Sequence, residues 1–226
     1  MLGLIGEAKD GIRIVGEIAG LTSVIQHSPE YDFKLLIKKP YKQKEIYKMI
    51  TAADVKLLRN KVSDEIETAE STLVISDDNH AIAREVIAEI PTVLEGVVNG
   101  VMPSAEHIAR VAITACKDVQ FRDFLLGAFT EYESNAVGAW LEIVSGAVKK
   151  DYAYPIATVL STYYYRDDKQ EEAAEMVREV LDHNPDYSLA QLLSRIYPVF
   201  SAEEMQTMAG ELHPKIKAII FEDTNE

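Results

Sequence analysis

One short run of the sequence, Asp77-Asp78-Asn79-His80, gathers side chains that could bind a metal ion or transfer a proton. Carboxylates and imidazoles are common zinc ligands and general bases. The same residue types also cap helix N-termini and match the helix dipole there, and a helical pattern follows directly, so we favour this structural role. The five histidines are dispersed, and no two have the i, i+4 spacing of a zinc-binding helix, so we expect no metal site.

Other catalytic patterns are equally incomplete. Ser76 and His80 would need an acid from elsewhere to form a triad, and no nucleophile-elbow pattern surrounds Ser76. The stretch Gly96–Gly100 has too few glycines, and no following lysine, for a phosphate-binding loop. Cys116 ends an apolar run that starts at Val111, which predicts a buried structural thiol rather than a nucleophile. We therefore predict no catalytic residue and no cofactor.

Helices must position these side chains, because apolar residues recur every three or four positions over most of the chain after residue 50. The period is strong over Ala53–Val74 and predicts a mainly α fold, a helical bundle or array. Residues 1–30 contain helix-weakening glycines and fit either a weak helix or a hairpin, and Tyr31–Ile37 fits a short strand. We divide the chain into an N-terminal segment of uncertain structure, a helical domain and a C-terminal tail, over residues 1–50, 51–213 and 214–226.

The stretch that follows residue 150 has the spacing of a single tetratricopeptide-like hairpin of two antiparallel helices. Pro155 is predicted to open the first helix, Asp167-Asp168 to form the turn, and Pro185 to stop the second helix. After a third helix, Ser201 and Glu204 have the spacing of a capping box for a fourth. Because a lone repeat cannot bury its own face, we expect it to pack on the helices before and after it.

Tyrosines are concentrated in the same region. Most of them should pack in the core or between helices. The alternative is an aromatic groove for a partner peptide, since tyrosines are common anchors at interfaces. For that alternative the partner-binding residues are Tyr154, Tyr163 and Tyr165.

The charge is unevenly distributed. The net charge is −14, but nine basic and only two acidic residues between Lys34 and Lys61 give that segment +7 and leave −21 for the rest. We favour contact of this segment with the protein's own acidic body or with a neighbouring copy, with Lys38, Lys39 and Lys42 as partner-binding candidates. An acidic protein, nucleic acid and an anionic membrane surface are the alternatives. Nucleic acid is the weaker one, because a body at −21 repels phosphates within the Debye length of about 10 Å.

The sequence shows neither a secretory signal nor an apolar stretch long enough to span a membrane. Apolar stretches such as Pro91–Val98 are far shorter than the roughly 20 residues of a membrane-spanning helix. The first residues lack the basic start and cleavage site of a secretory signal. The single cysteine excludes an internal disulfide. We therefore expect a cytoplasmic protein without a transmembrane segment.

The region from Ala105 to Phe200 resembles the C-terminal helical part of the actinobacterial domain-of-unknown-function 4192 family. The order and spacing of four stretches carry this resemblance: Asp118–Leu125, Trp140, Ala153–Leu160 and Asp182–Leu193. The resemblance implies a helical fold and no activity, because the family has no assigned chemistry. The α/β portion typical of the family is not recognisable here, so the chain resembles a divergent or shortened member. A phage or mobile element could carry such a compact version.

These observations together predict a non-enzymatic protein-interaction module, with a protein partner and with a homo-oligomer also compatible. One alternative is an acidic mimic of nucleic acid that inhibits a host protein. Another is an enzyme whose site is assembled from distant acids, for example Asp77, Asp78 and Glu85. Strongly shifted carboxylate pKa values in a pocket would favour the enzyme.

Overall fold

The chain consists of two compact units, Met1–Asp32 and Phe33–Glu226. The computed structural model describes part of each unit, namely residues 4–7, 13–16, 50–72 and 80–222. In the first unit, β1 (Leu4–Glu7) and β2 (Arg13–Gly16) pair antiparallel, with Ile5 opposite Val15. Of the two structures expected for residues 1–30, the described residues therefore form the hairpin. The short strand predicted at Tyr31–Ile37 lies outside the described residues.

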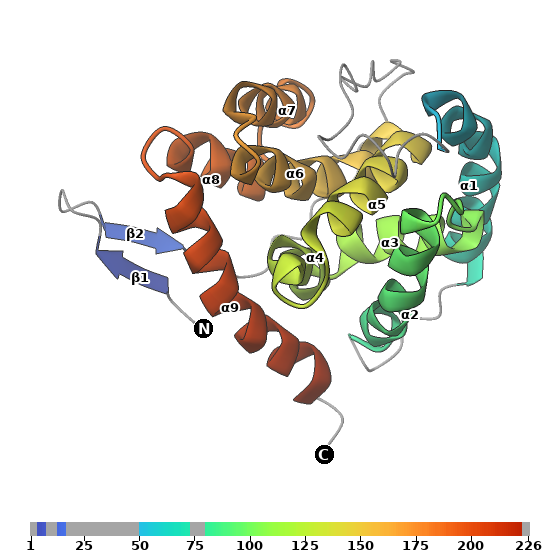
Figure 1. Ribbon diagram of the computed structural model, residues 1–226, viewed down its shortest axis with the longest axis horizontal. Helices are drawn as coiled ribbons and strands as arrows, with labels where there is room; N and C mark the ends of the chain where they lie inside the picture. The colour runs from blue at the N-terminus through green and yellow to red at the C-terminus, as the bar shows by residue number, and fades with distance from the viewer. Residues whose placement is uncertain (1–3, 8–12, 17–49, 73–79, 223–226) are drawn as a thin grey trace. The chain divides into compact units, whose positions relative to one another are not determined.

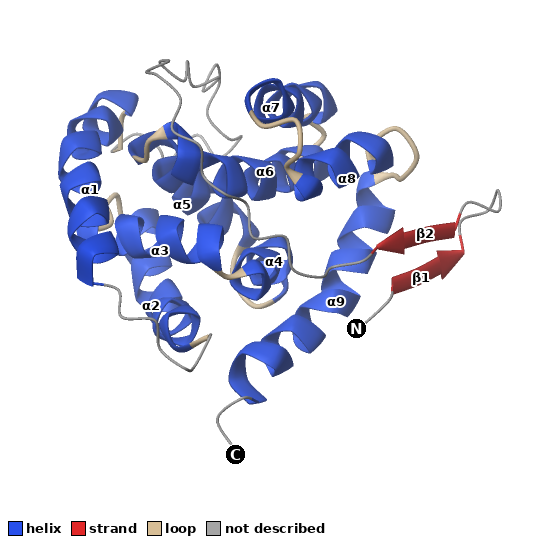
Figure 2. Ribbon diagram, turned by 180° about the vertical axis from the view of Figure 1, so that it is seen from behind, coloured by secondary structure: helices blue, strands red, loops and turns tan. Residues whose placement is uncertain are grey.

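The described part of the second unit is helical throughout (Figures 1 and 2). The mainly α fold predicted from hydrophobic periodicity is therefore confirmed. None of these described helices is long and apolar enough to cross a membrane. The helices are α1 (Ala52–Thr72), α2 (Ala81–Val98), α3 (Ala105–Lys117), α4 (Val119–Gly127), the 3-10 turn η2 (Ala128–Thr130), α5 (Ser134–Ala147), α6 (Lys150–Arg166), α7 (Gln170–His183), α8 (Ser188–Ile196) and α9 (Ala202–Glu222).

Helix α6 is at the centre of this unit. It contacts α3, α4, α5, α7 and α9, and Figure 1 shows α7 alongside it. The core around α6 contains the largest fully buried side chains, among them Trp140, Tyr163, Phe121 and Phe124. The apolar stripes of these helices therefore meet in one core, as their 3.6-residue period requires.

Helix α6 begins earlier than the sequence analysis predicted. Pro155 was expected to open the helix, but α6 starts at Lys150 and Pro155 lies inside it. A proline within a helix leaves the carbonyl four residues earlier without its usual N–H donor, here the carbonyl of Asp151. The thiol of Cys116 approaches that oxygen at 3.7 Å and donates to it. The contact helps α6 to tolerate its proline.

The turn between α6 and α7 has a left-handed residue where a helix usually ends in glycine. Asp168 has φ 58°, and the backbone N–H of Lys169 donates to the carbonyl of Tyr164 at 3.0 Å. This six-to-one bond is the mark of a Schellman motif, with aspartate in place of the usual glycine. The predicted turn at Asp167-Asp168 is thus confirmed, as is the close pairing of α6 with α7.

Helix α9 begins with the predicted capping box. The hydroxyl of Ser201 accepts from the N–H of Glu204 at 3.2 Å, and the Glu204 carboxylate accepts from the N–H of Ser201 at 2.8 Å. The helix continues through residue 213, where the domain boundary was placed, and Pro214 lies inside it. The helical part therefore extends to Glu222.

The packing of α9 on α4 depends on one close approach. His213 is buried directly against Gly127, where an added Cβ would lie 2.6 Å from the Cβ of His213. The His213 Nδ1 lies 3.1 Å from the carbonyl of Phe124. Two further bonds connect α9 to other elements, from Arg84 to the carbonyl of Ile220 and from Lys217 to Glu131.

Candidate functional site

Three consecutive tyrosines of α6, Tyr163, Tyr164 and Tyr165, form what we call the tyrosine hub. Successive helix positions are about 100° apart, so the three side chains point in three directions. Each hydroxyl donates to a different element. Tyr163 donates to the Leu125 carbonyl of α4 at 2.8 Å, and Tyr164 donates to the Glu142 carboxylate of α5 at 2.7 Å. Tyr165 donates to the carbonyls of Tyr197 and Phe200, after α8, at 2.7 and 2.8 Å.

The hub is buried, and this places the aromatic candidates from the sequence in the core. Tyr163 and Tyr165 are part of the hub, and Tyr165 also stacks on Tyr197 with ring centroids 4.3 Å apart. Burial raises the pKa of both hydroxyls. Tyr154, about three turns before Tyr165 on α6, is buried with its ring 6.4 Å from that of His183. Core packing, the favoured interpretation of the tyrosines, is thus what the structure shows.

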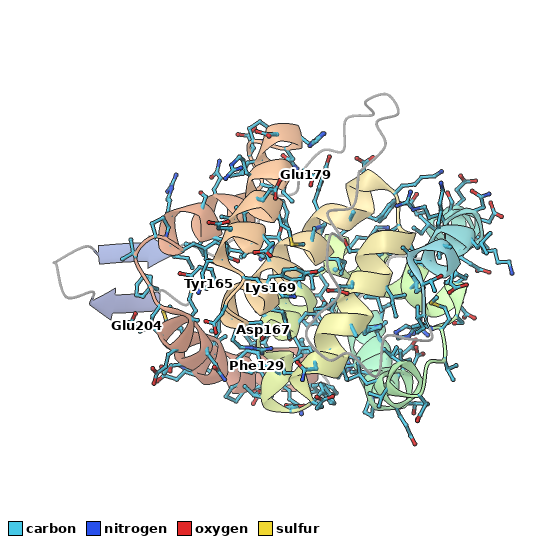
Figure 3. The ribbon with its side chains drawn as sticks, turned by 45° about the horizontal axis from the view of Figure 1, so that its top comes forward. Phe129, Tyr165, Asp167, Lys169, Glu179 and Glu204 are labelled. Carbon is cyan, nitrogen blue, oxygen red and sulfur yellow. The ribbon has the colours of Figure 1, made fainter. Side chains whose placement is uncertain are left out.

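Charged side chains surround the hub at the α6–α7 turn (Figure 3). The guanidinium of Arg166 lies over the rings of Phe129 and Tyr163, 4.9 Å from each centroid. The ammonium of Lys169 lies 4.4 Å from the Tyr164 centroid. Burial raises the pKa of Glu142, and Tyr164 and Lys169 partly oppose that rise. The sequence analysis did not recognise these groups, because Phe129 and Glu142 lie on elements other than α6. The contacts of Arg166 with Tyr163 and of Lys169 with Tyr164 are local to the end of α6.

A second buried polar group connects two of the stretches that carry the family resemblance. Asp118 caps α4 by accepting from the N–H of Phe121 at 3.1 Å, and its other oxygen lies 2.8 Å from Nδ1 of His80. Arg122 donates twice to the neighbouring carboxylate of Asp123 and interacts with Tyr187, from the segment before α8. Burial raises the pKa of Asp123, and Arg122 opposes the rise. The polar residues of these stretches therefore join helices.

A third group lies between α2 and α3. Nδ1 of His107 lies 2.8 Å from the Glu89 carboxylate, which also accepts from Arg110 at 2.6 Å. Burial lowers the pKa of His107. Burial alone would raise the pKa of Glu89, but His107 and Arg110 hold it below its usual value. The ring of Trp140 lies 5.8 Å from that of His107 and is fully buried.

The structure describes only some of the side chains proposed for chemistry. Ser76, Asp77 and Asp78 lie outside the described residues, whereas Glu85 is paired with Arg110 at 2.8 Å on the surface. Within the described residues, no three His, Cys, Asp or Glu side chains are close enough to hold a metal ion.

Cys116 is half-buried rather than fully buried, and its surroundings favour the predicted structural role. Burial raises its pKa to about 12. At that pKa the reactive thiolate is almost absent at neutral pH. The sulfur is instead engaged with a backbone carbonyl of α6.

The described surface has a feature that the sequence analysis missed. On α8, Leu192 is 38% exposed and Val199, just beyond the helix, is 57% exposed. With the half-buried Ile196 between them, they have i, i+4, i+7 spacing, and we call these three residues the α8 ridge. The spacing of these three residues is visible in the sequence, but the sequence does not show which face of a helix is exposed to solvent. The lysine candidates Lys38, Lys39 and Lys42 lie outside the described residues.

Comparison with known families gives one match. The family described as "Domain of unknown function (DUF4192)" matches residues 42–199, which is more than half of the 226-residue chain. The chain belongs to the DUF4192 family. No curated protein and no solved structure matches it.

The DUF4192 match is longer than the resemblance seen in the sequence, which began only at Ala105. It starts at residue 42 and so includes α1 and α2. The tyrosine hub, the Asp118–Arg122 group and the α8 ridge all fall within it. Helix α9 follows the last matched residue.

Proposed function

We propose that this DUF4192 protein is a non-enzymatic interaction module that binds a partner protein through the α8 ridge. The exposure of Leu192 on α8 and of Val199 in the turn that follows it carries the proposal. A single exposed apolar side chain is ordinary, but neighbouring ones on successive turns are typical of helix-mediated recognition. The ridge offers two turns of apolar surface to another chain.

The buried carboxylates of the first two polar groups support binding over catalysis. Raised carboxylate pKa values, such as those of Asp123 and Glu142, also occur in active sites. Here each of these carboxylates is buried and accepts hydrogen bonds from Arg122 or Tyr164. Glu142 thereby joins α5 to α6, whereas Asp123 pairs with the adjacent residue of α4, and burial leaves neither carboxylate a free approach for a substrate.

The tetratricopeptide-like character of α6 and α7 is part of the same proposal. Ala173 of α7 is fully buried where the motif needs a small residue, and Val177 follows it one turn later. Helix α8 then packs on α7, as the first helix of a following repeat would. Such hairpins serve mainly as binding scaffolds. A reducing cytoplasm suits the single, structural cysteine.

The test is cross-linking in native cells followed by mass spectrometry, with wild type and the variant Leu192→Asp/Val199→Asp. The matched control is Leu57→Asp on α1, whose side chain is 77% exposed. We expect the wild type and the control to capture the same protein with cross-links to α8, and the double variant to lose it. Capture that is unchanged in the double variant would refute the proposal. Cross-links only between two copies of this chain would also refute it, by replacing the partner with a homo-oligomer.

A further inference from the structure

The α8 ridge lies in a stretch of the chain that is almost free of charge. Between Asp186 and Glu203, Arg195 is the only charged residue, whereas 27% of the whole chain is charged. Part of this stretch is exposed, including Leu192, Arg195 and Val199. The cores of protein interfaces are depleted of charged residues but enriched in arginine. The composition of this exposed stretch is therefore typical of an interface.

Arg195 lies on the same face of α8 as the ridge. It follows Leu192 by three positions and precedes Val199 by four, and these steps bring side chains next to one another on a helix. Val199 lies beyond the end of α8, but the backbone continues to turn there. The N–H groups of Val199 and Phe200 both donate to the carbonyl of Ile196 at 2.9 Å. The arginine and the two exposed apolar side chains therefore form one surface.

Arg195 has no partner among the described residues. It is exposed, and neither an ion pair nor a hydrogen bond of its guanidinium to another described residue is present. The exposed Arg178 of α7 has Glu175 and Asp182 three and four positions away on its own helix. Helix α8 contains no Asp or Glu. The other helical arginines all donate hydrogen bonds, namely Arg59, Arg84, Arg110, Arg122 and Arg166.

Helix stability explains only the position of this charge. Arg195 lies in the last turn of α8, where a positive charge is favourable to the helix dipole. The dipole does not explain why exposed apolar side chains lie on either side of Arg195. Nor does it explain why no described carboxylate pairs with Arg195 in a chain whose net charge is −14. A partner that supplies both an apolar surface and a carboxylate accounts for all three features.

We infer that the partner of the α8 ridge is an amphipathic helix with an aspartate or glutamate between two apolar positions. Its apolar side chains contact Leu192 and Val199, and its carboxylate accepts from Arg195, whose guanidinium can donate two parallel hydrogen bonds to one carboxylate. Leu192 and Val199 are seven positions apart, about 10 Å along a helix, so two turns of a partner helix match them. This inference rests on the proposed function and specifies the chemistry of the partner.

The probe for this inference is a fluorescent 15-residue amphipathic helical peptide with leucines on one face and a single glutamate between two of them. It is titrated into the full chain and followed by anisotropy. Its counterpart has lysine in place of that glutamate. The test variant is Arg195→Glu. The matched control, Arg178→Glu, makes the same change in net charge at an exposed position of α7.

We expect wild type and the Arg178→Glu control to bind the glutamate peptide about tenfold more tightly than the lysine peptide, because the lysine replaces attraction with repulsion. Arg195→Glu should reverse this preference, and the milder variant Arg195→Gln should abolish it. Leu192→Ser should weaken both peptides alike, because the apolar contact is common to them. Circular dichroism verifies that each variant is folded.

Four outcomes would overturn the inference. One is a preference that stays unchanged in Arg195→Glu. Another is the same reversal in Arg178→Glu, because binding would then follow net charge alone. The third is a wild type that binds neither peptide. The last is self-association of the wild type that Arg195→Glu abolishes in sedimentation, because a second copy of this chain would then occupy the ridge.

These outcomes are distinct from failure of the proposed function. If cross-linking finds a partner lost in Leu192→Asp/Val199→Asp but retained in Arg195→Glu, the ridge binds a partner and the charge inference is wrong. If the peptide preference reverses as expected but no cellular protein depends on Leu192 and Val199, the proposed function is wrong.

Discussion

Replacing Gly127 with alanine should detach or strain α9. The new Cβ would lie 2.6 Å from Cβ and 2.7 Å from Nδ1 of His213, closer than real contacts of this kind. The nearest atom is itself a Cβ, so the clash cannot be relieved by a side-chain rotation, and α9 must move. Overpacking of this kind costs about 1–3 kcal/mol. Losing the bond between His213 and the Phe124 carbonyl adds roughly 1 kcal/mol.

The better helix propensity of alanine offsets up to about 1 kcal/mol of that loss. We therefore expect a decrease of about 2 kcal/mol in the free energy of unfolding, measured by urea denaturation. The matched control is Gly210→Ala in α9, where the added Cβ would lie 3.7 Å from Thr130, an ordinary contact. This control should be stabilised by up to about 1 kcal/mol.

Limited proteolysis gives an independent readout of the same change. Cleavage should appear within α9 in Gly127→Ala and be absent in Gly210→Ala, because a displaced helix exposes its backbone. A Gly127→Ala protein as stable and as resistant as the wild type would refute the close packing of α9 on α4.

Three further outcomes follow from the fold. Asp168→Gly should raise the free energy of unfolding by up to about 1 kcal/mol, because glycine adopts the left-handed conformation without strain; a lower urea midpoint would contradict the Schellman turn. Ala173→Phe should lower the free energy of unfolding by about 1–3 kcal/mol, because the larger side chain overpacks the contact between α6 and α7. A melting curve like that of the wild type would contradict the pairing of these two helices. Stability should also decline as pH falls below about 6.5, because burial lowers the pKa of His107 in the folded state and protonation then favours the unfolded chain. His107→Gln should remove part of that decline, and an unchanged pH profile would count against the contribution of His107.

Local signals in the sequence predicted much of the helical unit. The box of Ser201 and Glu204 caps α9, as their types and spacing indicated. The apolar period after residue 50 predicted the amphipathic helices that form the core. Each of these features depends on residues within a turn or two of one another, so a single sequence contains the information.

Contacts between distant residues could not be predicted in the same way. The bond from Tyr163 to the Leu125 carbonyl joins positions 38 residues apart, and the approach of His213 to Gly127 joins α9 to α4. Nothing in the local pattern of either residue identifies its partner. The sequence analysis missed the early start of α6 for a related reason, because the Cys116 thiol that contacts the Asp151 carbonyl comes from α3.

The tyrosine hub limits which changes of length the chain can accept. A helix advances by about 100° per residue, so deleting one residue between Pro155 and Tyr163 would rotate all three hydroxyls away from α4, α5 and the turn after α8 at once. No compensating substitution at a single position restores three bonds that point in three directions. In DUF4192 relatives that keep this hub, we therefore expect insertions and deletions only in the connections between helices, such as the turn before α5, and a fixed length of α6 from Pro155 to Tyr165.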